Sequence, residues 1–165
     1  MPTVAELLQG ASTLAGETAR LDTELLLCHT LNKPRSWLYT WPEAEVEVPL
    51  VNEFESLLAS RRQGHPIAHL TGRREFWSLN LRVNEHTLIP RPETETLVEW
   101  ALDLPLPEAA SVLDLGTGSG AIALALASER PNWQVRALDK SEQALQVARE
   151  NAAELALARV QFGCS

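Results

Sequence analysis

The sequence predicts an α/β fold preceded by a small helical bundle and a β-hairpin linker. Apolar side chains recur at helical spacing over residues 1–64, and residues 74–83 alternate between apolar and polar. The apolar run Val112–Leu115 leads into three closely spaced glycines and then into an uncharged stretch of strong helix formers. We therefore expect a bundle over residues 1–64, a linker with a hairpin over 65–91 and an α/β domain over 92–165.

The composition excludes several classes of protein. The 165 residues carry a formal net charge of −8, which argues against direct nucleic-acid binding. No apolar run approaches the roughly 18 residues that a membrane span needs, and the N-terminus lacks a signal-peptide core. Cys28 and Cys164 lie far apart and form no Cys-x-x-Cys motif. They are expected to be reduced thiols, which predicts a cytoplasmic protein without membrane contact.

The bundle begins with a predicted capping box, Thr3-x-x-Glu6. Further helices are expected over about residues 18–31 and 48–63, with Gly64 as a natural end of the last one. The bundle shows no catalytic constellation and is better suited to recognising a partner. The predicted inward faces are Val4, Leu7, Leu8, Ala11 and Leu14 in the first helix, Leu21, Leu25, Cys28 and Leu31 in the second, and Leu50, Phe54, Leu57, Leu58 and Arg61 in the third.

The linker contains two histidines with the i,i+4 spacing of metal ligands on a helix. Pro66 disfavours a helix start between His65 and His69, and no carboxylate or cysteine cluster completes a site. We therefore predict no metal. The alternation over residues 74–83 instead predicts a short antiparallel pair of strands.

The segment Ile89-Pro-Arg-Pro-Glu-Thr-Glu95 has two interpretations. Pro92 suits the first turn of a helix, and Glu93 and Glu95 would lie at the positive end of its dipole, so the segment can be a well-capped helix start. Alternatively, the two prolines stiffen a loop that lies over a ligand pocket. The charge pattern favours the helix start and leaves the second interpretation open.

The glycine turn predicts a small-molecule site. Gly116, Gly118 and Gly120 allow a tight turn and a close approach of the backbone to a ligand. The helix behind them offers unpaired N–H groups and a positive dipole end. A plain turn without a ligand is the weaker interpretation, because three glycines cost about 0.5–1 kcal/mol each where alanine would fit.

Two cofactors fit this turn. Gly116-x-Gly118-x-x-Ala121 matches the relaxed dinucleotide fingerprint, and Asp139, at the end of the next apolar strand, could accept ribose hydroxyls of either cofactor. Asp114 favours S-adenosyl-L-methionine (AdoMet), because a carboxylate disfavours a pyrophosphate and attracts a sulfonium and an ammonium. A dinucleotide-dependent enzyme remains the alternative.

Four motifs in order carry a family resemblance. They are Pro66-Ile-Ala-His-Leu-Thr-Gly72, Arg74-Glu-Phe-Trp77, Leu88-Ile-Pro-Arg-Pro-Glu-Thr-Glu95 and Leu113-Asp-Leu-Gly-Thr-Gly-Ser-Gly-Ala-Ile-Ala-Leu124. Together they closely resemble the HemK/PrmC family of glutamine methyltransferases. The resemblance implies a helical bundle, a hairpin linker and a Rossmann-like methyltransferase domain. It also implies methyl transfer from AdoMet to the glutamine side-chain nitrogen in the Gly-Gly-Gln loop of class 1 peptide chain release factors, with S-adenosyl-L-homocysteine as product.

The resemblance also implies roles for individual residues. The glycine turn would wrap the methionine part of AdoMet, Asp139 would hold the ribose, and Asp114 would help with the ammonium directly or through water. Arg91 and Glu95 would lie beside the pocket as second-rank candidates. The cofactor-binding residues implied in this way are Asp114, Gly116, Thr117, Gly118, Ser119, Gly120 and Asp139.

The sequence departs from the family pattern in one respect. Members carry an Asn-Pro-Pro-Tyr motif that holds the substrate amide, and no such motif occurs here. We therefore expect no catalytic residue within these residues, only the first part of the methyltransferase domain, and no activity of the 165 residues alone. The strand at Val112–Leu115 would keep one unpaired edge, so residues after about 111 are expected to be either loosely ordered or stabilised by self-association. A non-catalytic module that binds release factors is the alternative function.

Overall fold

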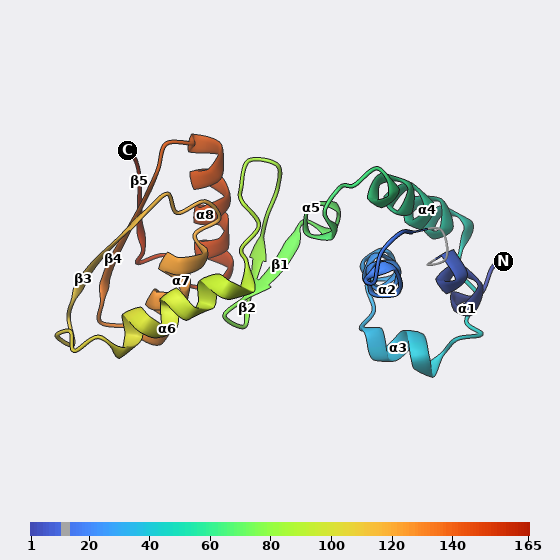
Figure 1. Cartoon of the computed structure of the whole chain (residues 1–165), viewed down its shortest axis with the longest axis horizontal. Helices are drawn as coiled ribbons and strands as arrows, with labels where there is room; N and C mark the ends of the chain where they lie inside the picture. Colours follow the sequence, from blue (N-terminus) through green and yellow to red (C-terminus); the bar gives the residue numbers. More distant parts are fainter. Residues whose placement is uncertain (11–13) are drawn as a thin grey trace. The chain divides into compact units, whose positions relative to one another are not determined.

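The computed structural model describes residues 1–10 and 14–165, and the chain divides into two compact units, Met1–Thr71 and Gly72–Ser165 (Figure 1). The boundaries of the bundle, linker and α/β domain that the sequence predicts, at residues 64 and 91, remain predictions. Each unit has its own hydrophobic core.

The first unit is helical. Its core contains Val4, Leu26, Leu38 and Phe54, which come from four different helices. Its helices are α1 (Val4–Leu8), α2 (Ala19–Leu31), α3 (Arg35–Thr40), α4 (Val48–Arg62) and α5 (Ile67–Thr71).

The capping box at the start of α1 is confirmed. The backbone N–H of Thr3 donates to Glu6 Oε2 at 2.8 Å, and the N–H of Glu6 donates to Thr3 Oγ1 at 3.3 Å. Helix α1 ends at Leu8, and the predicted inward residue Ala11 lies outside the described residues.

The predicted inward face of α2 is wrong at its first position. Leu21 is 40% exposed, whereas Asp22 and Glu24 are buried. Arg61 Nε donates to Asp22 Oδ2 at 2.9 Å from α4, and Arg35 donates to Glu24 from α3. Cations on neighbouring helices thus allow carboxylates to occupy positions that a hydrophobic pattern assigns to leucine.

The second unit begins with a β-hairpin and continues as an α/β domain. Strands β1 (Arg73–Phe76) and β2 (Leu79–Arg82) pair antiparallel, with Arg73 opposite Arg82 and Phe76 opposite Leu79. The elements that follow are η2 (Pro92–Thr94), α6 (Glu95–Asp103), β3 (Ser111–Leu115), α7 (Ala121–Glu129), β4 (Gln134–Asp139), α8 (Glu142–Glu154) and β5 (Gln161–Cys164).

The strands β3, β4 and β5 form a parallel sheet in that order, and helices alternate with them along the chain. Helix α7 packs on β3 and β4, and α8 packs on β4 and β5, so both helices cover the same face of the sheet (Figure 1). This arrangement confirms the predicted α/β class with a Rossmann-like order of elements.

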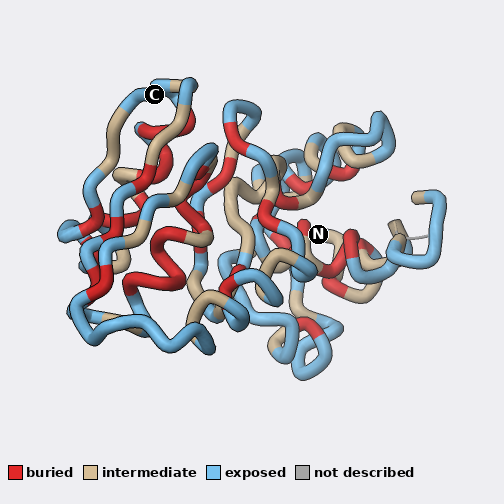
Figure 2. The backbone as a smooth tube through the Cα atoms, turned by 60° about the vertical axis from the view of Figure 1, so that its left-hand side comes forward, coloured by how far each residue is buried: buried red, intermediate tan, exposed pale blue. Residues whose placement is uncertain are grey.

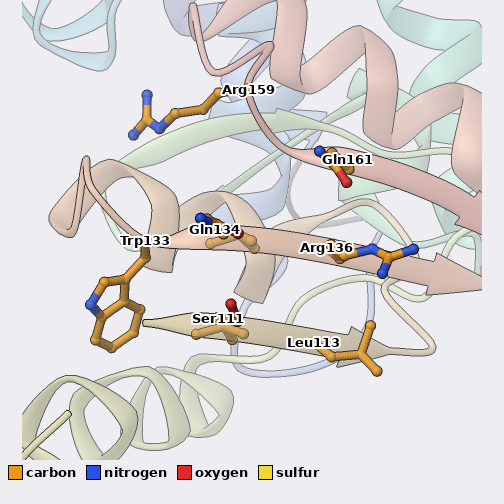
Figure 3. Close-up of a pocket in the computed structure, with 9 residues that line it drawn as sticks. Ser111, Leu113, Trp133, Gln134, Arg136, Arg159 and Gln161 are labelled. Atoms are coloured by element: carbon orange, nitrogen blue, oxygen red, sulfur yellow. The ribbon is translucent and has the colours of Figure 1, made fainter. Parts of the chain in front are cut away.

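Burial alternates along the sheet strands. Val135 and Ala137 of β4 are buried towards the helices, whereas Gln134 and Arg136 are exposed. Figure 2 colours the backbone by the burial of each residue. The exposed side chains of three strands line a hollow of about 430 Å³ on the other face (Figure 3). The lining includes Ser111, Leu113, Gln134, Arg136 and Gln161.

The apolar run Val112–Leu115 is typical of a strand buried on both faces, and this prediction is wrong for β3. Leu113 is 54% exposed and Leu115 is 69% exposed. Within the part of the chain that the structure describes, β3 pairs only with β4, and no element covers the outer face of these leucines. The predicted unpaired edge of β3 is therefore present.

Candidate cofactor site

The glycine turn lies where β3 and β4 reach their carboxyl ends. The backbone N–H groups of Gly116 and Thr117 both donate to the carbonyl oxygen of Leu138, at 2.9 and 3.0 Å. These bonds fold the turn over the end of β4 and bring it next to Asp139. The carboxyl ends of parallel strands are where α/β sheets bind ligands.

The backbone at Gly118 faces open space. Its φ is +55°, and a Cβ built there would meet no heavy atom within 4 Å. A side chain would be strained in this conformation and would fill the space in front of the turn. The turn therefore fits a ligand that approaches the backbone closely.

Asp139 ties the turn to the sheet. Its Oδ2 accepts a hydrogen bond from the N–H of Gly118 at 2.8 Å, and its Oδ1 accepts one from the N–H of Ser141 at 2.9 Å. Each carboxylate oxygen has two acceptor positions, so each keeps one for a further donor. A fixed carboxylate with one free position on each oxygen suits a pair of neighbouring hydroxyl groups, such as those of a ribose.

Asp114 lies under the turn, on β3. Its Oδ2 accepts a hydrogen bond from the Thr117 hydroxyl at 2.7 Å, and the backbone N–H of Ala123 in α7 also bonds to its carboxylate. Burial raises the pKa of Asp114 above its ordinary value, and the nearby charge of Asp139 raises it further, although both hydrogen bonds oppose the shift. Among the described residues, the groups that set this pKa include no cation, so no described side chain neutralises Asp114 when it is ionised.

The side chains of Thr117 and Ser119 are largely buried. Thr117 is 7% exposed and Ser119 is 2% exposed. The Thr117 hydroxyl donates to Asp114, so it supports the turn from β3.

The segment that carries Arg91 and Glu95 meets the hairpin. Pro92 begins η2, and Glu93 and Glu95 lie in the first turns of η2 and α6, as the helix-start interpretation expects, although no described side chain caps either start. Arg91 is exposed just before η2. Glu95 Oε1 accepts a hydrogen bond from the N–H of Trp77 at 2.9 Å. The structure thus brings Glu95 to the hairpin turn.

Sequence reasoning missed Asn151 of α8. Asn151 is 1% exposed and bonds to the backbone of both β2 and the glycine turn. A detectable signal was present, since Asn151 falls at helical spacing on the apolar stripe of Ala144, Ala148 and Ala152. A polar residue on such a stripe is expected to be hydrogen-bonded when buried.

The described residues contain neither a group of metal ligands nor a helix that could span a membrane. The described residues contain no group of three or more His, Cys, Asp or Glu side chains that could hold a metal ion. In the same residues, no helix is both long enough and apolar enough to cross a membrane.

Comparison with known families gives two matches in chain order. Residues 6–72 match the PrmC N-terminal domain, and residues 106–164 match a methyltransferase domain. These matches define the class: a Rossmann-like methyltransferase domain preceded by a PrmC-type helical domain. AdoMet, rather than a dinucleotide, is thereby confirmed as the cofactor of the site.

Curated relatives extend this similarity over nearly the whole chain. The chain is 53% identical to a release factor glutamine methyltransferase of Shewanella oneidensis, over 96% of this chain and 57% of the relative. It is 54% identical to that of Vibrio cholerae, over 88% of this chain and 51% of the relative. It is 51% identical to that of Pseudomonas aeruginosa, over 98% of this chain and 58% of the relative. The resemblance to the HemK/PrmC family is confirmed, and the chain spans slightly more than half the length of these relatives.

Proposed function

We propose that a protein containing these residues methylates the side-chain nitrogen of the glutamine in the Gly-Gly-Gln loop of class 1 peptide chain release factors. One observation carries the proposal: two carboxylates meet at the glycine turn, where Asp139 accepts from the Gly118 N–H and Asp114 accepts from the Thr117 hydroxyl. The relatives named release factor glutamine methyltransferase support the substrate. Translation termination is the process in which this modification would act.

AdoMet supplies a methyl group on a positively charged sulfur. The backbone of Gly116, Gly118 and Gly120 would hold its methionine part, and Asp139 would accept bonds from its ribose hydroxyls. The charge of Asp114 would favour the ammonium end, and Thr117 and Ser119 would support the turn from below. Arg91 and Glu95 stay second-rank candidates, with Glu95 acting through the hairpin turn.

The transfer step needs groups beyond these. An amide nitrogen is a poor nucleophile because its lone pair is delocalised into the carbonyl, so in-line transfer depends on alignment and electrostatics. In the family that resembles this chain, an Asn-Pro-Pro-Tyr motif supplies the alignment. The motif is absent from residues 1–165, and we propose that these residues alone bind AdoMet without turnover.

The proposed partners are class 1 release factors, recognised in part through the helical unit Met1–Thr71. The net charge of −8 disfavours direct nucleic-acid binding. Cys28 and Cys164 are both free thiols, which fits the proposed cytoplasmic location.

We also propose that these 165 residues self-associate through β3. Its free edge and its exposed Leu113 and Leu115 offer backbone and apolar surface to another chain. Sedimentation at several concentrations tests this. Leu115→Lys should shift the distribution towards monomer, and an unchanged distribution would contradict the assignment to β3.

Two experiments test the proposed function. Calorimetry with S-adenosyl-L-homocysteine should give binding to the 165-residue chain, and NAD should give none; the opposite result would favour a dinucleotide enzyme. For catalysis, a protein that joins these residues to the Asn-Pro-Pro-Tyr region is incubated with AdoMet and a release factor. Mass spectrometry should then find one added methyl group on the glutamine. A complex that forms without added mass would favour the non-catalytic binding module.

A further inference from the structure

We propose that Asn151 is a positioning residue that locks the glycine turn to the β-hairpin. The inference rests on the proposed function, because the turn it positions is the AdoMet cradle. Asn151 itself lies on α8, behind the turn, and we assign it no contact with the cofactor.

The amide group of Asn151 makes three hydrogen bonds to backbone atoms. Its Oδ1 accepts from the N–H of Arg82 at 2.7 Å, and its Nδ2 donates to the carbonyl oxygen of Arg82 at 3.1 Å. Its Nδ2 also donates a hydrogen bond to the carbonyl oxygen of Ser119, with 2.9 Å between the nitrogen and the oxygen. One side chain thus joins β2 to the cofactor turn, which lies far from β2 in the sequence.

Asn151 is the hydrogen-bond partner of backbone groups in two residues, Ser119 and Arg82. Ser119 is 2% exposed, so its carbonyl oxygen is shielded from water and would be left without a hydrogen bond if the amide were removed. Arg82 uses its outward-facing N–H and carbonyl on Asn151 in the way that a neighbouring strand would. Leaving a buried carbonyl unpaired is costly, so the bond to Ser119, together with the two bonds to Arg82, holds the two segments in one position.

Close packing beside Asn151 leaves the turn little freedom. Gly120, which follows Ser119 and precedes α7, has a φ of +84°. A Cβ built on it would lie 3.2 Å from Ala148 Cβ, one helical turn before Asn151, and 3.1 Å from Leu124 Cδ1. The turn therefore rests against α8 at Gly120 and is hydrogen-bonded to α8 at Ser119. Its position follows that of α8.

The chemistry requires an amide at this position. An ionised aspartate would accept from the Arg82 N–H but would place a negative charge against two carbonyl oxygens. A protonated aspartic acid has one O–H donor and restores one of the two lost bonds. Alanine removes all three bonds. The affinities of Asn151→Asp and Asn151→Ala should therefore respond differently to pH. If Asn151 only filled space, the two variants would respond alike.

The test measures S-adenosyl-L-homocysteine affinity and amide exchange for the wild-type chain, Asn151→Ala, Asn151→Asp and Val160→Ala. Val160 is 5% exposed in the same core and precedes β5, at the opposite end of the sheet from the glycine turn. It controls for lost stability without lost loop contact. Asn151→Ala should weaken binding about tenfold and speed exchange at Gly118 and Gly120, while Val160→Ala should leave binding unchanged.

The aspartate variant adds a pH profile. Its affinity relative to wild type should be low at about pH 8 and should recover towards about pH 5, because burial against two carbonyl oxygens raises the pKa of the new carboxyl above its ordinary value of about 3.9. The charged groups around this site are Arg73 and Arg82 on the hairpin and Glu150 and Glu154 on α8, which pair with one another. Measuring wild type at every pH removes their contribution.

The outcomes separate the two proposals. If wild type does not bind S-adenosyl-L-homocysteine, the proposed function fails, and loop exchange still reports on Asn151. If wild type binds and both Asn151 variants bind equally well with unchanged exchange, the positioning role is wrong. If neither Asn151 variant folds, amide hydrogen exchange in the wild-type chain tests the positioning role instead. The N–H groups of Arg82 and Gly120 should open together, and much faster exchange at Arg82 would overturn the proposal.

Discussion

A shielded carboxylate in each unit shows how differently the two units use negative charge. Glu24 of α2 is 1% exposed and is surrounded by cations and a phenol. Arg20 Nε donates to it at 3.1 Å, Arg35 Nη2 at 2.5 Å and the Tyr39 hydroxyl at 2.6 Å. From the described residues, Asp114 of β3 receives only the Thr117 hydroxyl and the Ala123 backbone N–H.

The pKa values of the two carboxyls shift in opposite directions. Burial alone would raise the pKa of Glu24, but hydrogen bonds from Tyr39, Arg35 and Arg20 outweigh it and lower the pKa below its usual range. Burial dominates at Asp114 and raises its pKa. Described cations therefore neutralise the charge of Glu24, whereas we propose that the charge of Asp114 serves a positively charged ligand, since perturbed pKa values are common at functional sites.

The largest expected effect is on the stability of the helical unit. Glu24→Ala removes a buried side chain and its charge-assisted bonds, and should lower the free energy of unfolding by about 3 kcal/mol. Urea denaturation measures this, with the exposed Glu53→Ala of α4 as control. Binding of S-adenosyl-L-homocysteine by the second unit should not change. A loss of affinity would break the contrast between a structural and a functional carboxylate.

The next effect concerns Asp139. Asp139→Ala removes the acceptor of the Gly118 N–H and the proposed ribose ligand, and should weaken AdoMet binding by about 1–3 kcal/mol. Calorimetry gives the value, and the exposed Glu142→Ala at the start of α8 serves as control. Equal affinity in wild type and Asp139→Ala would show that the ribose site is misassigned.

The smallest effect is a difference in the pH dependence of stability. The lowered pKa of Glu24 contributes to the stability of the fold at pH values above 4.5, the ordinary pKa of this group. This contribution is lost as the pH falls through the folded-state pKa. The raised pKa of Asp114 acts in the opposite sense: its contribution is present below its ordinary value of 3.8 and is lost as the pH rises through the folded-state pKa.

Urea titrations of wild type, Glu24→Gln and Asp114→Asn across this acidic range test the difference. As the pH falls, the stability advantage of wild type over Glu24→Gln should shrink, while wild type should gain on Asp114→Asn. Parallel curves for the two variants would contradict the opposite shifts.

The glycine turn and the order of elements around it could be predicted from sequence because they depend on local signals. Glycines, apolar strands and a terminal aspartate lie within one continuous stretch, Val112–Asp139. The capping box at Thr3 was predictable for the same reason.

The errors came from contacts between distant segments. Leu21 is wrongly predicted to face inward because Arg61 and Arg35, which pair with Asp22 and Glu24, lie on other helices. The hairpin turn at Trp77 and Ser78 adopts positive φ without glycine or asparagine, and the bond from Glu95 to Trp77 is made between segments that no periodicity connects. The same holds for the bonds of Asn151 to β2 and to the glycine turn.

The central claim is that the unneutralised charge of Asp114 serves the cofactor. The most direct measurement is the calorimetric affinity of S-adenosyl-L-homocysteine, which carries the ammonium group, for wild type, Asp114→Asn and Glu24→Gln. The account predicts about tenfold weaker binding to Asp114→Asn and unchanged binding to Glu24→Gln. Equal affinity of wild type and Asp114→Asn, with both proteins folded, would contradict it.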